Sequence, residues 1–421
     1  GILILKMAKK IYFDYAATTP VDKEVLRAMK PYFSNTFGNP SSVHYFGQEV
    51  IAAVDKAREK IAKLLHCNFN EIIFTGSSTE SNNLAIIGIA KNFQFSIFPP
   101  APKLRQSGNF QKNTKYKIPN TKYHIISTNI EHESVLEPLK EIQKNNHEVT
   151  YLKVNKDGFI KSSDLEQSIK NNTLLISIIY ANNEIGTIQP IKEIGKLLEK
   201  INGKRKEAGF GKVYFHTDAV QAFQFLECRP DWLKVDLLTF SGHKIYGPKG
   251  IGGLYVRKNT PISPVVIGGG QEFGLRSGTL NVPYIVGLAK AVELVLKNQE
   301  KYSKSVLDLR NQLLNFIIKY NSDAKLNGAV LNRLPNNLNI MFPGVNNETM
   351  LVALDIAGFA VSAGSACSSR SSQVSHVLNA IGLNDVQARE SIRITLGKYN
   401  SKKEIKKLAE TISVLSKKFK L

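Results

Sequence analysis

Short apolar runs alternate with helix-like stretches over much of this sequence, and this alternation constrains the fold more than any other feature. Strands that alternate with helices form a mainly parallel sheet covered by helices. Such sheets form clefts at the carboxyl ends of their strands. Polar residues follow several of the runs, so the sequence predicts an α/β fold with a functional cleft at one sheet edge. The candidate strands are residues 71–75, 123–128, 149–153, 174–180, 212–217, 237–240 and 252–256.

The pattern changes near residue 295. A long helical stretch over 297–320 precedes shorter strand-like pieces such as 337–341. A chain of 421 residues is long enough for two domains. We therefore predict a large domain over 22–295 and a smaller α+β domain formed by two segments, 1–21 and 296–421.

Lys244 ends the string Ser241-Gly242-His243-Lys244, directly after a predicted strand. Desolvation lowers the pKa of a lysine and makes its amine nucleophilic. The natural partner of such an amine is the aldehyde of pyridoxal phosphate (PLP), held as a Schiff base. A single lysine in a loop is more often a surface residue, so this interpretation depends on the residues around it.

Asp218 ends another predicted strand, and Gln221 follows three residues later. A PLP enzyme needs a carboxylate against the pyridine nitrogen, because the protonated ring acts as an electron sink. Asp218 suits this role, and Gln221 could donate to the phenolic oxygen of the ring. The alternative is an aspartate that forms a turn or caps a helix.

A phosphate site is predicted where strand 71–75 leads through residues 76–81 into the helix-like stretch 82–90. Helix N-termini bind phosphate through free backbone N–H groups. Ser78 and Thr79 would supply such groups together with their hydroxyls. A plain capped helix is the alternative.

Taken together, these strings resemble the cysteine desulfurases, PLP enzymes of fold type I in the class-V aminotransferase group. The resemblance begins at residues 12–20 and extends almost to the C-terminus. It implies a large domain with a mainly parallel mixed sheet flanked by helices, plus a smaller α+β domain. It also implies conversion of L-cysteine to L-alanine via a PLP aldimine, with the sulfur transferred to a protein cysteine as a persulfide. Further matching strings lie at residues 37–42, 131–132, 182–186, 216–219, 276–279, 362–367 and 391–393.

The resemblance assigns the persulfide to Cys367. This cysteine lies in a small, polar, glycine-containing run over 363–372, which we expect to be mobile. A thiol that attacks sulfur must be ionisable and partly exposed. Cys67 instead fits an inert, buried cysteine, and Cys228 has no evident role. The long loop after Cys367 resembles the branch that passes sulfur to an iron–sulfur scaffold or a tRNA-thiolation carrier.

The resemblance also implies roles for four other residues. His132 would stack on the ring and move a proton, and Arg393 would grip the substrate carboxylate with help from Asn183. Thr279 would reach the phosphate in a neighbouring subunit, which implies a homodimer. The alternatives are a helix-capping histidine and a surface arginine. No metal site is predicted. The phosphate contacts within one chain would come from Ser78, Thr79, Ser241 and His243.

The chain is strongly basic, with 56 Lys and Arg, 35 Asp and Glu and a net charge of +21. A basic protein can bind nucleic acid, but no nucleic-acid motif is present, so solvated charge on helices is the favoured interpretation. An insertion at about 92–122 departs from the family. From Lys91 to Lys122, both included, there are seven Lys or Arg, several aromatic residues and no Asp or Glu. It is either a surface insertion or a segment that binds single-stranded nucleic acid.

Three other sequence features bear on location. No apolar run reaches membrane-spanning length, and the first residues do not form a signal peptide, although Met7 is an alternative start. Three cysteines provide no disulfide framework, which predicts a reducing cytoplasm. Three alternative functions stay open: a selenocysteine lyase, an aminotransferase that has no use for Cys367, and a non-catalytic basic protein on the same fold.

Overall fold

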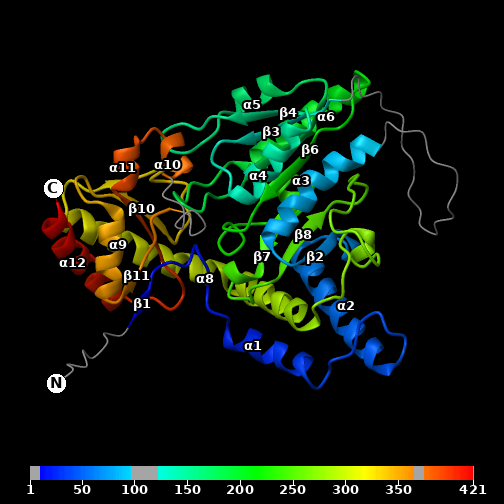
Figure 1. Ribbon diagram of the computed structural model, residues 1–421, viewed down its shortest axis with the longest axis horizontal. Coiled ribbons are helices and arrows are strands. Elements are labelled where there is room, and N and C mark those ends of the chain that lie inside the picture. The colour runs from blue at the N-terminus through cyan, green and yellow to red at the C-terminus, as the bar shows by residue number, and fades with distance from the viewer. Residues whose placement is uncertain (1–9, 96–121, 365–373, 421) are drawn as a thin grey trace.

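The computed structural model describes residues 10–95, 122–364 and 374–420, and places them in two lobes joined by one long helix (Figure 1). The larger lobe contains a seven-stranded sheet with the order β2-β8-β7-β6-β5-β3-β4. Strands β4, β3, β5, β6 and β7 are parallel, whereas β8 is antiparallel to both β7 and β2. The strands are β2 (Ile72–Thr75), β3 (His124–Thr128), β4 (Glu148–Leu152), β5 (Thr173–Ile179), β6 (Tyr214–Asp218), β7 (Leu237–Ser241) and β8 (Gly252–Val256).

The predicted strands are confirmed, each with its ends shifted by at most two residues. Their apolar runs reflect burial on both faces. Every residue of β5 is buried, for example, as expected for a parallel strand covered by helices on both sides. Successive side chains point to opposite faces, so Ile72 and Phe74 contribute to one core and Ile73 contributes to another.

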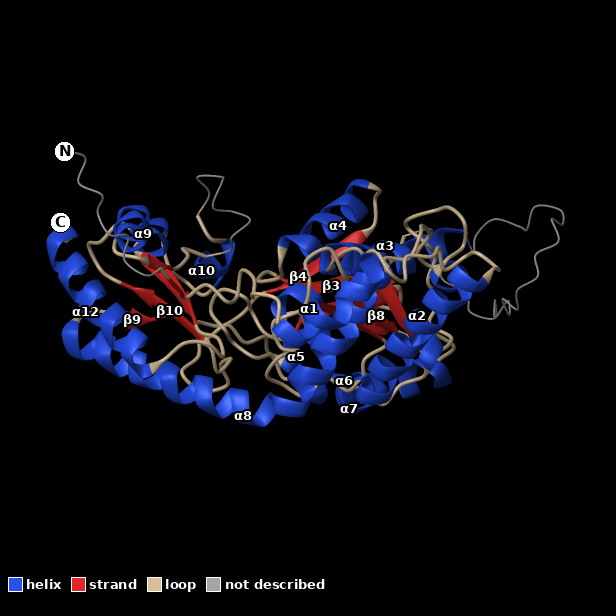
Figure 2. Ribbon diagram, turned by 90° about the horizontal axis from the view of Figure 1, so that it is seen from below, coloured by secondary structure: helices blue, strands red, loops and turns tan. Residues whose placement is uncertain are grey.

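Helices cover both faces of this sheet (Figure 2). On one face lie α3 (Ser78–Phe95) and α4 (Glu133–Lys144), whose side chains share a core with Ile73 and Leu237. On the other face lie α2 (Tyr45–Leu65), α6 (Ile191–Glu207) and the first half of α8 (Val282–Tyr320). Three shorter helices complete the lobe: α1 (Lys23–Met29), α5 (Ser162–Ser168) and α7 (Pro230–Leu233).

The smaller lobe contains a three-stranded antiparallel sheet with the order β12-β10-β9. A short parallel pair also joins β1 (Ile11–Tyr12), on the N-terminal arm, to β11 (Phe359–Ala360). The arm therefore packs on this lobe. The other elements are β9 (Lys325–Leu326), β10 (Asn337–Met341), β12 (Ser391–Thr395), α9 (Asn347–Ile356), α10 (His376–Ala380), α11 (Asp385–Arg389) and α12 (Lys402–Phe419).

Helix α8 begins well before the predicted start at residue 297. Its N-cap is Asn281, whose side chain accepts from the Tyr284 N–H. The helix passes residue 295 without a break, contributing Val295 to the core of the larger lobe and Val306 to that of the smaller one. The division into 22–295 and 296–421 with the arm stays a prediction. None of the described helices is long and apolar enough to cross a membrane.

Candidate active site

Lys244 lies in the short 3-10 helix η3 (Gly242–Lys244) that follows β7. Its Nζ donates to the carbonyl oxygens of Ala16 at 2.6 Å and Ala17 at 2.7 Å. The Gln221 side chain also donates to the Ala16 oxygen, at 3.0 Å. The structure thus brings Lys244 and Gln221 to one carbonyl of the N-terminal arm.

Asp218 ends β6 and is almost fully buried. One carboxylate oxygen accepts from Asn82 Nδ2 at 2.8 Å, and the other accepts from the Val220 N–H at 3.0 Å. These two donors fix the plane of the carboxylate. The turn-forming alternative is also correct, because the bond from the Val220 N–H to Asp218 is local. This bond does not prevent the carboxylate from also contacting a ligand.

His132 is the N-cap of α4, where its Nδ1 accepts from the Ser134 N–H at 3.1 Å and lies 2.8 Å from Ser134 Oγ. Because Nδ1 accepts from a backbone N–H, a neutral ring carries its proton on Nε2. Burial lowers the pKa of His132; Asp218 raises it and Lys244 lowers it further. The helix-capping alternative is correct, and this capping fixes the orientation of the ring.

Sequence reasoning missed Asn82, which joins these two residues. It is fully buried one turn into α3, and its Nδ2 donates to both Asp218 Oδ2 and Ser134 Oγ at 2.8 Å. Its Oδ1 has no partner among the described residues. The local signal is a pair of asparagines, Asn82 and Asn83, directly before the apolar run 84–90 of the helix.

The predicted phosphate turn is the start of α3. Ser77 Oγ accepts from the Glu80 N–H at 3.1 Å, and the Glu80 carboxylate accepts from Gly76 N–H at 2.7 Å. A Cβ at Gly252 would lie 2.8 Å from the Ser78 nitrogen, so only glycine lets β8 pass under this turn. Ser78 is partly buried and Thr79 is exposed.

Two further predicted contacts lie at the end of β7. Ser241 is buried as the last residue of the strand. His243 Nδ1 lies 3.2 Å from the Thr18 hydroxyl, and burial, reinforced by Lys244 and Lys249, lowers the pKa of His243 to about 3. This ring is therefore neutral at pH 7.

Arg393 lies on β12 and is 1% exposed, so the surface-charge alternative is wrong. Its guanidinium donates to Asp14 Oδ1 at 2.9 Å and to the Asn183 carbonyl at 3.1 Å, while its Nε has no partner among the described residues. Sequence reasoning missed Asp14. Asn183 is buried, and it reaches Arg393 through its backbone.

Thr279 is not brought into this cluster and is exposed on the single chain. Cys367 and residues 96–121 of the basic insertion lie outside the described residues.

Comparisons with known proteins give a consistent result. Residues 11–96 and 109–408 match the family described as Aminotransferase class-V. Cysteine desulfurase IscS from Dictyoglomus turgidum is 45% identical over 399 residues, which cover 95% of this chain and 92% of the relative. The chain belongs to the cysteine desulfurase family of the class-V aminotransferases. Its activity is cysteine desulfuration, and its cofactor is pyridoxal phosphate.

Other members of the family agree. Cysteine desulfurase IscS 1 from Archaeoglobus fulgidus is 39% identical, with 95% of each chain covered. A solved structure titled NifS-like protein has a TM-score of 0.83 and 35% identity, covering 96% of this chain and 99% of its own. A second, SspA in complex with cysteine, has a TM-score of 0.76 and 37% identity, covering 93% and 100%. The predicted fold is confirmed.

The residues present fit this cofactor. A buried carboxylate at Asp218, a lysine amine at Lys244 and a neutral ring at His132 meet at neighbouring strand ends. The first turn of α3 at Ser78 leaves N–H groups without partners inside the helix, as anion sites require. The donor set therefore matches a protonated pyridine, an aldehyde and a phosphate.

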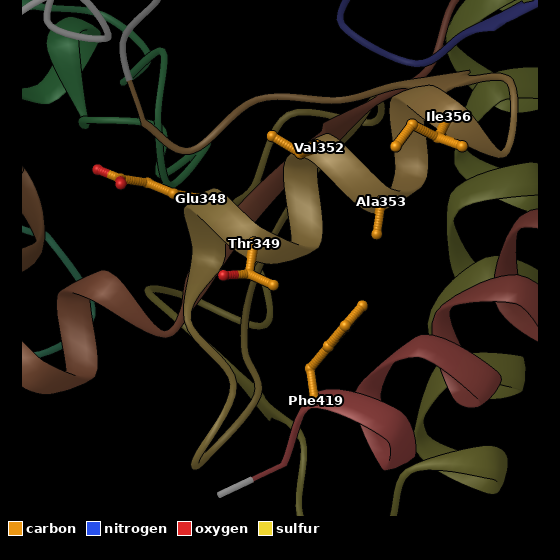
Figure 3. A pocket seen from close by; sticks show the side chains of 6 residues that line it. All are labelled: Glu348, Thr349, Val352, Ala353, Ile356 and Phe419. Atoms are coloured by element: carbon orange, nitrogen blue, oxygen red, sulfur yellow. The ribbon is translucent and has the colours of Figure 1, made fainter.

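A separate apolar groove lies between α9 and α12 (Figure 3). Val352 and Ile356 on one side of it are 61% and 80% exposed. None of its lining residues belongs to the polar cluster described above. The groove is lined by Glu348, Thr349, Val352, Ala353, Ile356 and Phe419.

Proposed function

We propose that this desulfurase uses Lys244 as its acid and base and Cys367 as the residue that receives sulfur. The observation that carries the proposal is the position of Lys244. It lies just after strand β7 and shares a carbonyl partner with Gln221, and the neighbouring parallel strand β6 ends at the buried Asp218. Bound PLP supplies an electron sink that labilises the substrate's α-proton and its carbon–sulfur bond.

Asp218 keeps the pyridine nitrogen protonated in this proposal, because a buried carboxylate held by Asn82 and Val220 presents its charge in a fixed direction. Lys244 removes the α-proton of the substrate and later returns a proton. His132, neutral and with its proton on Nε2, would stack on the bound cofactor and donate to the reacting groups. The phosphate is held by four residues: Ser78, Thr79, Ser241 and His243.

Arg393 grips the substrate carboxylate, and Asn183 supports it through its carbonyl. Its Nε is buried and unpaired among the described residues, so the guanidinium retains a donor for a ligand. Asp14 holds the other side of the guanidinium.

Cys367 completes the reaction as a nucleophile. Its thiolate attacks the substrate sulfur, the bond between that sulfur and carbon breaks, and the sulfur stays on Cys367 as a persulfide. The carbon takes a proton, and alanine leaves. The overall change is one enzyme thiol plus L-cysteine to one enzyme persulfide plus L-alanine. Because this thiol must stay reduced between cycles, we place the enzyme in the cytoplasm.

We infer that the active unit is a homodimer in which Thr279 contacts the phosphate of the partner. Large apolar side chains are exposed in two surface loops of the larger lobe. Phe37 at 66% and Val43 at 90% lie in the loop before α2, and Ile267 at 82% lies in the loop between β8 and α8. Exposed apolar patches of this kind mark protein interfaces. Ile267 lies in the same loop as Thr279, which supports a shared site.

We propose a protein as the final sulfur acceptor, either a scaffold for iron–sulfur clusters or a carrier for tRNA thiolation. The test of the function is to incubate the purified protein with L-cysteine and a reductant. Alanine and sulfide should appear in equal amounts. The Cys367→Ser variant should bind cofactor and cysteine but release no sulfide, and sulfide release by that variant would contradict the proposed role.

A further inference from the structure

Residues 365–373, which include Cys367, lie outside the described part of the chain, but the residues on both sides of them are placed. The preceding residue is Gly364, and the segment is followed by Val374 and Ser375. Ser375 bonds to the side chain of Glu184, and Gly364 passes close to the same side chain. This side chain belongs to the loop after β5 and has no role in the function proposed above.

Ser375 supplies the first contact. It is the N-cap of α10, and its hydroxyl lies 2.6 Å from Glu184 Oε2. A carboxylate accepts, so the hydroxyl donates, while its oxygen accepts from the Leu378 N–H at 3.2 Å. The start of α10 is thereby tied to Glu184. A charge-assisted bond of this length is stronger than a bond between neutral groups.

Gly364, on the other side of the segment, lies close to the same carboxylate. Its φ is +99°, a conformation that side chains rarely adopt, and a Cβ there would lie 3.1 Å from Glu184 Oε2. The chain therefore passes Glu184 at a distance that leaves little room for any residue larger than glycine. Residues on both sides of the Cys367 segment thus lie near one carboxylate oxygen, and Ser375 donates to it.

The backbone of Glu184 is held by several hydrogen bonds. It is 2% exposed, and its N–H donates to Asn182 Oδ1 at 2.9 Å. Its carbonyl accepts from the side chains of Asn337 at 3.1 Å and Asn339 at 3.3 Å, both on β10. These bonds fix the backbone of Glu184, and the bond to Ser375 orients its side chain, as a positioning residue requires.

Glu184 and the start of α10 also adjoin the residues proposed to bind the substrate and the cofactor. The neighbouring residue, Asn183, accepts from Arg393. On the cofactor side, His376 Nε2 lies 3.0 Å from the carbonyl of Glu131, the residue before His132. Because a carbonyl only accepts, His376 donates here. Ser375 and His376 are thus tied to two loops: the one that carries Asn183, the partner of Arg393, and the one that carries His132.

We propose that Glu184 is a positioning residue for sulfur transfer: it holds Ser375 by a hydrogen bond and limits the room at Gly364, and these two constraints on the flanks of the Cys367 segment set where the thiol meets the substrate. Glu184 touches no reacting atom in this proposal, which rests on the proposed role of Cys367. Misplacement of a reacting group by about 1 Å can cost about 100-fold in rate.

The test compares Glu184→Ala, Glu184→Gln and Ser375→Ala in the cofactor-loaded enzyme. Glu184→Ala and Ser375→Ala should lower kcat for alanine formation by about 10- to 100-fold. KM for cysteine and the change in cofactor absorbance on adding cysteine should stay near wild type. Glu184→Gln can still accept from Ser375, so it should recover most of the rate. Ser163→Ala, which removes an exposed hydroxyl on α5, should leave the rate unchanged.

A double variant sharpens the result. If Glu184 and Ser375 act through one bond, Glu184→Ala combined with Ser375→Ala should be no slower than the slower single variant. Additive losses would overturn the proposal. Equal losses of kcat, cofactor content and cysteine affinity would also overturn it, because they would indicate a general defect in folding.

Alkylation offers a readout that does not depend on turnover. The rate at which iodoacetamide labels Cys367, followed by mass spectrometry of its peptide, should change in both Glu184→Ala and Ser375→Ala. Cys67 is an internal reference, since burial raises its pKa to about 12 and it lies in the other lobe. An unchanged rate at Cys367 would contradict the proposal.

The same experiments separate this proposal from the role of Cys367. If Cys367→Ser keeps full turnover, the proposed function fails and the Glu184 variants carry no meaning for sulfur transfer. If Cys367→Ser is inactive while Glu184→Ala turns over at the wild-type rate, only the positioning role of Glu184 is wrong.

Discussion

In the larger lobe the polar cluster is built on the ends of buried parallel strands, whereas in the smaller lobe its residues lie on the antiparallel strand β12 and at the start of α10. Asp218, Asn82 and His132 form a hydrogen-bonded chain through Ser134 that requires no ligand. Arg393 lies on β12, and Ser375, the N-cap of α10, donates to Glu184. The cofactor half is therefore organised in advance, and the sulfur half depends on contacts between the lobes.

This difference has a physical origin. The cofactor must stay in one place throughout the cycle, and rigid dipoles that need no reorganisation stabilise charge most effectively. The sulfur must first meet the substrate and then meet an external acceptor. A thiol on a connecting segment can serve both positions, provided that its ends are fixed.

The largest effect is expected from Lys244→Ala, which removes the central group of the cofactor half. Turnover of cysteine to alanine should fall by at least about 1,000-fold, because no other amine in the described site can replace Lys244 as acid and base. The assay is alanine formation by the cofactor-reconstituted variant. A fall of less than tenfold would show that another group moves the proton.

The next effect tests the smaller lobe. Arg393→Lys replaces a planar fork by a single ammonium, so KM for cysteine should rise by about 10- to 100-fold, with a smaller change in kcat. Steady-state kinetics over a wide range of cysteine concentration measure both. An unchanged KM would mean that Arg393 serves only its bond to Asp14.

A smaller effect is expected from Asn82→Ala. Loss of the amide removes one donor from buried Asp218 and one from Ser134, and an unsatisfied buried acceptor costs about 1 to 3 kcal/mol. The dissociation constant for PLP should rise by about tenfold, as measured by titration of the cofactor-free protein. Asn83→Ala is the matched control, because the Asn83 side chain bonds only to Thr79 of its own helix. Equal effects of the two variants would exclude a special role for Asn82.

The final prediction concerns stability and Glu131, which adjoins both halves. Burial raises the pKa of Glu131 to about 8, above its unfolded value of 4.5. The folded protein thus holds a proton that the unfolded chain releases, and stability falls as pH rises between these values. From pH 5 to pH 7, wild type should lose about 2 to 3 kcal/mol relative to Glu131→Gln. Denaturant unfolding at both pH values measures this difference, and parallel pH profiles would contradict it.

The fold could be predicted from the sequence because its strands are continuous apolar runs and most of its predicted site residues follow them directly. Asp218 and Lys244 stood out for that reason. The start of α8 was missed because residues 282–296 contribute to the core of the larger lobe. Their apolar pattern therefore continues that of the preceding domain and does not mark a new helix.

Asn82, Asp14 and Glu184 were missed for a different reason. The bond from Asn82 to Asp218 spans 136 positions, that from Arg393 to Asp14 spans 379, and that from Ser375 to Glu184 spans 191. No local pattern marks contacts of this kind. Lys244 also bonds to backbone carbonyls, which have no side-chain signature.

Mass spectrometry of the cysteine-containing peptides, after one equivalent of L-cysteine is added to the cofactor-loaded enzyme without reductant, tests the central claim most directly. The account predicts one additional sulfur atom on Cys367, none on Cys67 or Cys228, and an equal amount of alanine. Alanine formed with no sulfur on Cys367, or with the sulfur on another cysteine, would contradict it.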